Sequence, residues 1–215
     1  MKAFNGKVKK VLFVLDNLGL KNTFKVISKN TLYFDHYFAL TANLNSVGNA
    51  PKVRGTYFIR KAEEEDFENL MSNIKSFDYE DRKEIIIRLF FYHAGFKNCY
   101  LALTEKGDIA AMQWLVYPAE NELIENEFQG RFYPLKKNQL MLQNFFTFPR
   151  FRGLGYTPAM VVELIKMAKE DGYRNVIGYV RKDRIGTINE MINIGFKLRK
   201  LIREYKILGK TNKAL

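Results

Sequence analysis

The sequence predicts an α+β fold in which helices pack around a central sheet. Short apolar segments bounded by glycine, proline or asparagine alternate along the 215 residues with segments of helical periodicity. Hydrophobic residues make up 47% of the chain and charged residues 27%, a composition typical of globular proteins that excludes a disordered or fibrous one. The single cysteine, Cys99, has no second cysteine to pair with. We therefore expect a cytoplasmic protein without disulfides.

The first 50 residues are predicted to be a basic, partly helical appendage, and residues 51–215 the main domain. Residues 1–50 contain seven lysines and two aspartates. Apolar residues between Lys7 and Ile27 recur at spacings of three, four and six, which indicates an amphipathic helix broken near Gly19. The stretch 45–51 has the composition of a linker. The segment either packs on the main domain or contacts an anionic membrane surface through its basic helix.

No segment is predicted to cross a membrane. The longest apolar run, Ile85–Phe91, is interrupted by Arg88, whereas a spanning helix needs about 20 apolar residues. The apolar stretch near the N-terminus ends at Asp16 after five residues, which is shorter than the apolar region of a signal peptide. We therefore expect neither a spanning helix nor a cleaved leader.

The main domain is predicted to begin with one strand and two helices. Thr56–Lys61 has strand composition, and the acidic run Glu63–Asp66 then favours a helix start, because carboxylates are stabilised at the positive end of the helix dipole. A second helix is predicted from Asp78 to His93, where Gly95 ends it.

Three strands are predicted next. Cys99–Thr104 and Ile109–Tyr117 form a hairpin around a turn that contains glycine. The acidic stretch Pro118–Gly130 is expected to be irregular. The apolar strand Leu140–Phe148 follows, and a proline marks its end.

The last third of the chain is predicted to continue with helix, strand, helix and strand. The helix Thr157–Asp171 has a proline near its start, where it is tolerated, and a glycine just past its end. The remaining predicted elements are the strand Val176–Val180, the helix Ile185–Asn193 and the strand-like segment Phe196–Leu208.

The turn between the strand Leu140–Phe148 and the next helix carries the clearest chemical signal. Its sequence, Arg150-Phe-Arg-Gly-Leu-Gly155, places two glycines one residue apart, so backbone N–H groups can approach a ligand without interference from Cβ atoms. The helix start adds unpaired N–H groups and a positive dipole end. These features predict a diphosphate cradle, with a simple tight turn as the alternative. The dinucleotide fingerprint is not met, because position 158 is proline.

This turn resembles the Gln/Arg-x-x-Gly-x-Gly/Ala signature of the GNAT acyltransferase superfamily. The segment Met191–Phe196 resembles the Gly-Phe close of the same family, and the resemblance covers residues 55–215. It implies a three-layer α/β arrangement whose mixed, mostly antiparallel sheet is splayed at its fourth and fifth strands, here Leu140–Phe148 and Val176–Val180. It also implies acetyl-CoA as the co-substrate. No metal is expected, because His36, His93 and Cys99 lack the spacing of metal ligands.

The resemblance further implies which residues contact acetyl-CoA. The pantetheine arm would lie between the splayed strands, and the diphosphate would bind the N–H groups of the turn. The expected contacts are Phe146, Thr147, Phe148, Arg150, Arg152, Gly153, Leu154, Gly155, Tyr156, Thr157 and Arg184, with Arg181 and Lys182 as alternatives to Arg184. Residues 129–215 carry eighteen basic and six acidic residues, an excess that an anionic co-substrate explains.

The sequence departs from the family pattern at catalytic positions. Arg184 replaces a common asparagine, and Met191 stands where the family often has a tyrosine that protonates the thiolate; methionine has no proton to donate. An amine acceptor must also lose a proton to a carboxylate, a histidine or an ordered water. The catalytic candidates are Glu127, Asn144 and Tyr179; the other polar groups considered are His93, Glu120, Glu122, Glu125 and Gln143, and each has a surface or packing role as its alternative.

These observations predict an N-acetyltransferase that moves an acetyl group from acetyl-CoA to an amine by direct attack on the thioester. The overall layout resembles GNAT-like proteins of cell-envelope polysaccharide synthesis, which implies an amino sugar or a nucleotide sugar as the acceptor. Two alternatives stay open. One is a degenerate domain that binds CoA or a partner without catalysis, because of Met191. The other is a nucleic-acid-binding protein, given the net charge of +12, although no nucleic-acid-binding motif is found.

Overall fold

The computed structural model describes residues 7–20, 23, 32–128, 132–207 and 210–214. Within them, eight strands form one sheet in the order β2-β3-β4-β5-β6-β1-β7-β8. Of these neighbouring pairs, only β5 and β6 run parallel. The strands are β1 (Leu32–Asn43), β2 (Tyr57–Lys61), β3 (Cys99–Thr104), β4 (Ile109–Val116), β5 (Gln139–Thr147), β6 (Asn175–Arg181), β7 (Lys197–Ile207) and β8 (Lys210–Ala214).

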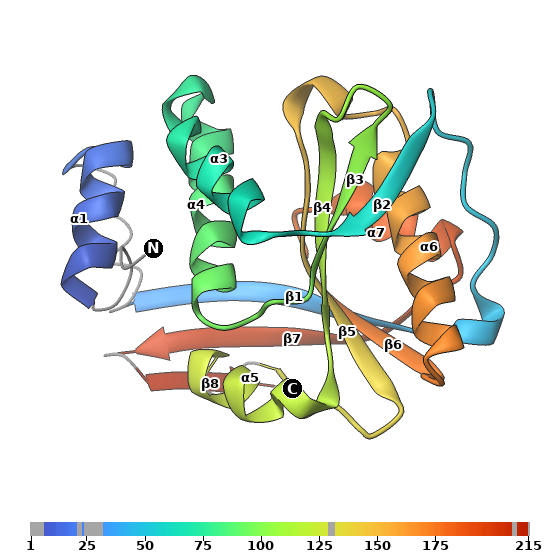
Figure 1. Cartoon of the computed structure of the whole chain (residues 1–215). Coiled ribbons are helices and arrows are strands. Elements are labelled where there is room, and N and C mark those ends of the chain that lie inside the picture. The colour runs from blue at the N-terminus through green and yellow to red at the C-terminus, as the bar shows by residue number, and fades with distance from the viewer. Residues whose placement is uncertain (1–6, 21–22, 24–31, 129–131, 208–209, 215) are drawn as a thin grey trace.

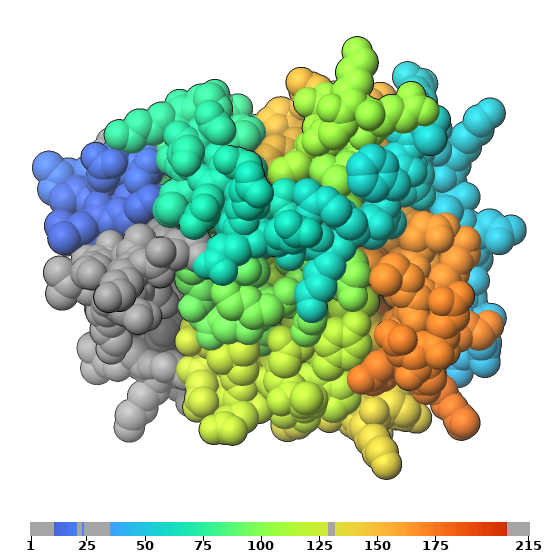
Figure 2. Space-filling model, in the orientation of Figure 1, coloured from blue at the N-terminus to red at the C-terminus, as the bar shows by residue number. Residues whose placement is uncertain are grey.

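Helices cover both faces of this sheet, so the molecule has three layers. The described helices are α1 (Lys7–Leu18), α3 (Glu64–Ser72), α4 (Tyr79–His93), α5 (Asn121–Phe128), α6 (Tyr156–Glu170) and α7 (Ile185–Asn193). In Figure 1, α3 and α4 lie on one side of the strands and α6 lies on the other. In the space-filling view, α1 borders the α3–α4 layer at one side of the molecule (Figure 2).

The alternation of side chains along the strands creates two hydrophobic cores. In β4, Met112 and Trp114 pack in the core beneath α3, α4 and α5, whereas Ala111 and Leu115 pack in the core beneath α6 and α7. This is the period-two pattern of a strand buried on both faces. The predicted class, a mixed and mostly antiparallel sheet flanked by helices, is confirmed.

The predicted splay of two central strands is also present. Residues 139–142 of β5 pair with residues 175–178 of β6, and the pairing stops there. Beyond that point β5 continues along β4 to Thr147, and β6 continues along β1 to Arg181. The register of β5 against β4 shifts between Met112 and Trp114, where Asn144 has a left-handed backbone (φ +52°). This β-bulge bends β5 away from β6.

Strand β1 corrects the expectation of an N-terminal appendage for residues 32–43. It lies inside the sheet, antiparallel to both β6 and β7. Ala39, Leu40 and Ala42 are buried and divide between the two cores. The lysines of residues 1–50 all precede this strand in the sequence. The net charge of the whole segment therefore does not indicate that its last part is apolar and pairs with the sheet.

Helix α1 packs on the main domain, as one of the two interpretations expected. The rings of Phe13 and Phe90 meet edge to face at 6.1 Å, and Arg82 Nη1 donates to the Asn17 carbonyl at 3.0 Å. The helix ends before Gly19, which has a left-handed backbone (φ +77°). The expected continuation to Ile27 falls largely on residues outside the described ranges. Among the described helices, none is both long and apolar enough to cross a bilayer.

The stretch Pro118–Gly130 also differs from expectation. It contains a short 3-10 turn at Pro118–Glu120 and the helix α5, where an irregular segment was predicted. The carboxylate of Glu120 accepts a hydrogen bond from the Tyr117 N–H at 2.8 Å, and Ile124 is buried against the α4 side of the sheet. Capping and one buried apolar face therefore stabilise a helix within an acidic sequence.

Candidate functional site

A cavity of about 1170 Å³ opens where β5 and β6 diverge. It is bounded by α4 on one side of the sheet and by α6 and α7 on the other. Six consecutive residues of β5, Leu142–Thr147, form one wall. The splay thus produces a passage between the two helical layers, of the size that small-molecule sites have.

The structure brings some of the predicted residues to this cavity and places others elsewhere. The lining includes Phe146, Thr147, Arg152, Gly153, Thr157 and Arg184, together with the catalytic candidates Glu127, Asn144 and Tyr179. Among the described residues that line the cavity, five predicted contacts are absent: Phe148, Arg150, Leu154, Gly155 and Tyr156. Phe148 and Tyr156 are buried in opposite cores, and Leu154 packs against the core beneath α6.

The two positions of the turn require glycine for different structural reasons. Both have left-handed backbones, with φ +72° at Gly153 and φ +88° at Gly155. A Cβ at Gly155 would lie 3.1 Å from the Lys52 carbonyl oxygen, whereas a Cβ at Gly153 would meet open space. Gly155 is therefore needed for packing against residues 52–53 and as the residue preceding α6. Gly153 leaves the edge of the cavity open.

The two arginines of the turn point in different directions. Arg152 forms an ion pair with the buried carboxylate of Asp81 on α4, and its Nε donates to the Thr147 carbonyl at 3.2 Å. Its side chain is half exposed and lines the cavity. Arg150 instead pairs with Asp108 in the β3–β4 turn. Only Arg152 of this pair contributes a cation to the cavity.

The turn is also tied to α6 through two hydroxyl groups. Thr147, the last residue of β5, and Thr157, in the first turn of α6, have their Oγ1 atoms 2.8 Å apart. The first N–H groups of a helix have no intrahelical partner. The end of β5 and the start of α6 are thus held together at the cavity wall, with unpaired helix N–H groups beside them.

Sequence analysis missed that two charged residues of α4 form a cluster with Arg184. Arg88, Glu84 and Arg184 line the cavity, and Glu84 pairs with Arg88 at 2.9 Å and with Arg184 at 3.1 Å. Burial by itself would raise the pKa of Glu84, but the guanidinium groups of Arg88 and Arg184 outweigh burial and lower it. The signal for this cluster was an arginine inside the apolar run Ile85–Phe91, which was used only to exclude a spanning helix.

A buried amide is the second feature that was missed. The side chain of Gln113, on β4, lines the cavity and is only 3% exposed. In the described part of the chain its Oε1 atom has no hydrogen-bond partner. A buried carbonyl oxygen without a partner is costly, so this position offers an acceptor to a ligand N–H or O–H group.

The catalytic candidates lie in distinct surroundings. The Tyr179 hydroxyl accepts a hydrogen bond from the Tyr133 N–H at 3.3 Å, its ring stacks on Phe132, and burial raises its pKa to about 12. The phenol is therefore protonated at neutral pH. Glu127 is exposed near the end of α5. Asn144 occupies the β-bulge.

Helix α7 contributes Glu190 and Met191 to the lining, among other residues. Met191 is buried, and its Cε atom lies 3.6 Å from the Cβ position that Gly178 lacks, so the two residues pack closely beside Tyr179. Glu190 also lines the cavity, and partial burial raises the pKa of its carboxyl group. Of the other polar groups considered, Gln143 lines the cavity, whereas Glu120 caps the turn after β4.

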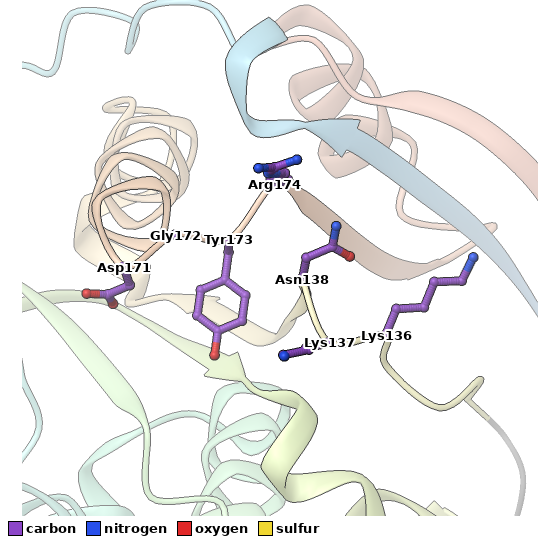
Figure 3. A pocket seen from close by; sticks show the side chains of 7 residues that line it. All are labelled: Lys136, Lys137, Asn138, Asp171, Gly172, Tyr173 and Arg174. Carbon is purple, nitrogen blue, oxygen red and sulfur yellow. The ribbon is translucent and has the colours of Figure 1, made fainter.

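A smaller basin of about 630 Å³ lies at the opposite ends of β5 and β6, where these strands begin. Figure 3 shows its lining, which includes the basic side chains of Lys136, Lys137 and Arg174. None of the residues predicted to bind acetyl-CoA lines it. In the part of the chain that the structure describes, no group of three or more His, Cys, Asp or Glu residues could hold a metal ion.

Comparison with known proteins shows the fold. No protein-family model and no curated protein matches the chain. Solved structures do match, among them a GCN5-related glucosamine N-acetyltransferase region of a fungal multi-domain β-N-acetylglucosaminidase, with a TM-score of 0.58 and 12% identity over 85% of this chain and 22% of that one. A GNAT-family acetyltransferase from Colwellia psychrerythraea matches with a TM-score of 0.54 and 13% identity over 94% of this chain and 73% of that one. A GCN5-related N-acetyltransferase from Sphaerobacter thermophilus matches with a TM-score of 0.53 and 12% identity over 90% of this chain and 59% of that one. The chain thus spans less than two thirds of the fungal and Sphaerobacter proteins.

Proposed function

We propose that this chain, which has the fold of the GNAT acetyltransferases, is an acyl-CoA-dependent N-acyltransferase that moves an acetyl group from acetyl-CoA to an amine. The observation that carries the proposal is the cavity between the diverging strands β5 and β6, with the left-handed turn at Gly153 and the start of α6 at its edge. A strand edge left by the splay, a helix N-terminus and room for an elongated ligand occur there together.

The chain's own groups fit an elongated, anionic thioester. The cations Lys83, Arg152 and Arg184 line the cavity, and the first N–H groups of α6 suit phosphate oxygens. Beyond Leu142, β5 has no pairing with β6, which leaves backbone groups for amides of the ligand. Acetyl-CoA would supply the acyl group already activated as a thioester. The proposed side-chain and backbone contacts are Phe146, Thr147, Arg152, Gly153, Thr157 and Arg184.

A phenol and two carboxylates of the chain suit the proton transfers of this reaction. Tyr179 uses its hydroxyl oxygen to accept from the Tyr133 N–H, so its own proton is available for a departing thiolate, the role that Met191 cannot fill. A general base must take the proton of the amine, and a carboxylate can serve. Glu190, whose pKa is raised by partial burial, and Glu127 both line the cavity.

We further propose that the acceptor is an amino sugar or a nucleotide sugar and that the reaction takes place in the cytoplasm. Carboxylates at Glu127 and Glu190 would attract a substrate ammonium group, and the rings of Phe132 and Tyr179 provide an apolar wall. The fungal structure of the same fold is described as a glucosamine N-acetyltransferase region, which supports testing glucosamine first.

Two measurements test this function. Acetyl-CoA at about 100 times its dissociation constant should stabilise the protein by about 2.7 kcal/mol, which for a chain of this size raises the thermal midpoint by about 5–10 °C. Thiol release from acetyl-CoA should then depend on an added amine, with glucosamine and UDP-glucosamine compared against alkylamines and amino acids.

The outcomes test the co-substrate, the catalytic activity and the sugar acceptor separately. No midpoint shift at millimolar acetyl-CoA would exclude the co-substrate. Tight binding of acetyl-CoA with no amine-dependent thiol release would favour the degenerate, non-catalytic alternative. Release with alkylamines but not with sugars would keep the reaction and exclude the sugar acceptor.

A further inference from the structure

We infer that Arg88 is a positioning residue that holds the β5 bulge, and with it one wall of the cavity, in the shape that the transfer requires. This inference rests on the proposed function. Arg88 lies on α4 among apolar residues, and its side chain is 8% exposed. A guanidinium placed so deeply needs partners for its donors.

Its partners are backbone atoms of the cavity wall. Arg88 Nε donates to the Asn144 carbonyl at 3.0 Å, and Arg88 Nη2 donates to the carbonyl of the next residue, Phe145. Consecutive carbonyls of a regular strand point in opposite directions, so one planar guanidinium cannot bind both. Here Asn144 has a left-handed backbone, the only non-glycine residue with φ above zero in the described ranges. Arg88 therefore binds a conformation that only the bulge provides.

The bulge decides where the wall residues lie. Because a peptide unit is planar and trans, a carbonyl turned toward Arg88 turns the N–H of the following residue away from it. Arg88 thereby sets the direction of the N–H groups of Phe145 and Phe146. If the bulge relaxed to regular pairing, the register against β4 would change by one residue and side chains would exchange faces. All five residues 143–147 line the cavity, so such a change would reshape it.

The charge of Arg88 is balanced by Glu84, one turn earlier on the same helix. Arg88 Nη1 donates to the Glu84 carbonyl at 2.7 Å and to Glu84 Oε2 at 2.9 Å. The other carboxylate oxygen of Glu84 accepts from Arg184, at the start of α7, at 3.1 Å. A continuous set of charged contacts therefore joins α4, the β5 bulge and the start of α7, three of the elements that enclose the site.

The chain contains a matched control for this role. Arg82 lies on the same helix and also binds backbone carbonyls, those of Asn17 at 3.0 Å, Lys75 at 3.1 Å and Phe77 at 2.8 Å. Among the described residues of the cavity lining, Arg82 does not appear. Arg82 and Arg88 thus share their chemistry but differ in what they hold in place.

The test compares Arg88→Lys with Arg82→Lys in the full chain, using acetyl-CoA and the amine found active. A lysine lacks the planar fork of donors with which Arg88 holds two carbonyls in fixed directions. We expect Arg88→Lys to lower kcat by about 100-fold, the effect of misplacing reacting groups, and to raise the KM for acetyl-CoA by a smaller factor. Arg82→Lys should lower the thermal midpoint and leave kcat within about twofold. A folded Arg88→Lys protein with wild-type kcat would overturn the inference.

A second measurement does not depend on turnover. The backbone amide resonances of residues 143–147 should shift in Arg88→Lys and stay unchanged in Arg82→Lys. This readout separates the inference from the proposed function, because it applies even if the wild-type protein acetylates no amine. Unchanged resonances would show that the bulge holds its shape without Arg88, and would overturn the inference.

Should Arg88→Lys fail to fold, Asn144→Gly replaces the wild type as the reference, because glycine takes a left-handed backbone without steric cost. The double variant Asn144→Gly/Arg88→Lys should then fold and retain the kcat of Asn144→Gly within about threefold. An unfolded double variant would show that Arg88 acts on stability alone. A folded one with a 100-fold lower kcat would show that Arg88 acts by a route other than the bulge.

Discussion

Gly153 and Gly155 share a left-handed backbone, but only Gly153 borders the cavity with open space around its α-carbon. We expect Gly153→Asn to keep the fold, because asparagine tolerates this backbone, and to place a side chain where the diphosphate is proposed to bind. The affinity for acetyl-CoA, measured by calorimetry, should fall by at least about tenfold, or about 1.4 kcal/mol.

Gly172 provides the control for this substitution. It follows α6, has a φ of +87° and open space around it, and lies outside the large cavity. Gly172→Asn should therefore match Gly153→Asn in stability and retain wild-type affinity. Equal affinities in the two variants would show that the turn at Gly153 has no part in binding.

The unpartnered amide of Gln113 gives a prediction of opposite sign for stability and binding. Replacing it with methionine removes a buried carbonyl oxygen that has no partner, which should stabilise the free protein by about 1 kcal/mol. The same change should weaken ligand binding if a ligand donates to this oxygen. Thermal unfolding with and without acetyl-CoA measures both effects.

Gln139→Met serves as the comparison for Gln113→Met. The Gln139 Oε1 atom accepts a hydrogen bond from the Lys136 N–H at 3.4 Å, so its loss should not stabilise the protein. A fall in stability for Gln113→Met would mean that this amide has a partner within the protein.

Glu84 gives the protein a defined acid sensitivity. Its pKa is lowered in the folded protein by Arg88 and Arg184, so the ionised form contributes stability above the unfolded pKa of about 4.3. That contribution disappears as the pH falls through the lower, folded pKa. The stability difference between wild type and Glu84→Gln, measured by urea unfolding, should be largest above about pH 5 and shrink toward pH 3. A difference that is independent of pH would contradict this assignment.

At the scale of elements, β1 and α1 should respond differently to substitution. Leu40 in β1 is fully buried, whereas Leu12 in α1 is 56% exposed. Leu40→Ala should lower the free energy of unfolding by about 2–5 kcal/mol, and Leu12→Ala by less than about 0.5 kcal/mol. Chemical denaturation of both variants measures the difference. Similar small losses in both would mean that residues 32–43 are dispensable for the sheet.

Local signals in the sequence were sufficient for some elements and insufficient for others. Strand β3 and helix α7 have the predicted bounds, 99–104 and 185–193, because a hairpin turn and Gly195 mark their ends. Helix α5 was missed because its acidic residues conceal one buried position, Ile124. The composition of residues 1–50 predicts an appendage for the segment that contains β1. Composition does not indicate that the partners of this strand are β6 and β7, which are distant in the sequence.

At the scale of the whole molecule, the site combines segments that are distant in the sequence. The turn 150–157 could be recognised because its glycines and arginines are contiguous. The contacts of Asp81 with Arg152 and of Glu84 with Arg184 join residues 71 and 100 positions apart. Only the packing of α4 across the splayed strands brings these groups together, so no local pattern could predict them.

The position of β1 also determines when the sheet can be completed. Among the residue pairs of β1 and β6, Asn43 and Asn175 are the nearest in sequence, and they are 132 residues apart. The other partner of β1, strand β7, begins only at Lys197. Contacts between such distant segments form slowly. Until both partners are available, β1 has two open edges and exposed apolar side chains, which favour aggregation. In refolding followed by pulsed hydrogen exchange, amide protection in β1 should therefore appear after that of the β3–β4 hairpin. During synthesis, one edge of β1 therefore stays unpaired until β7 has left the ribosome.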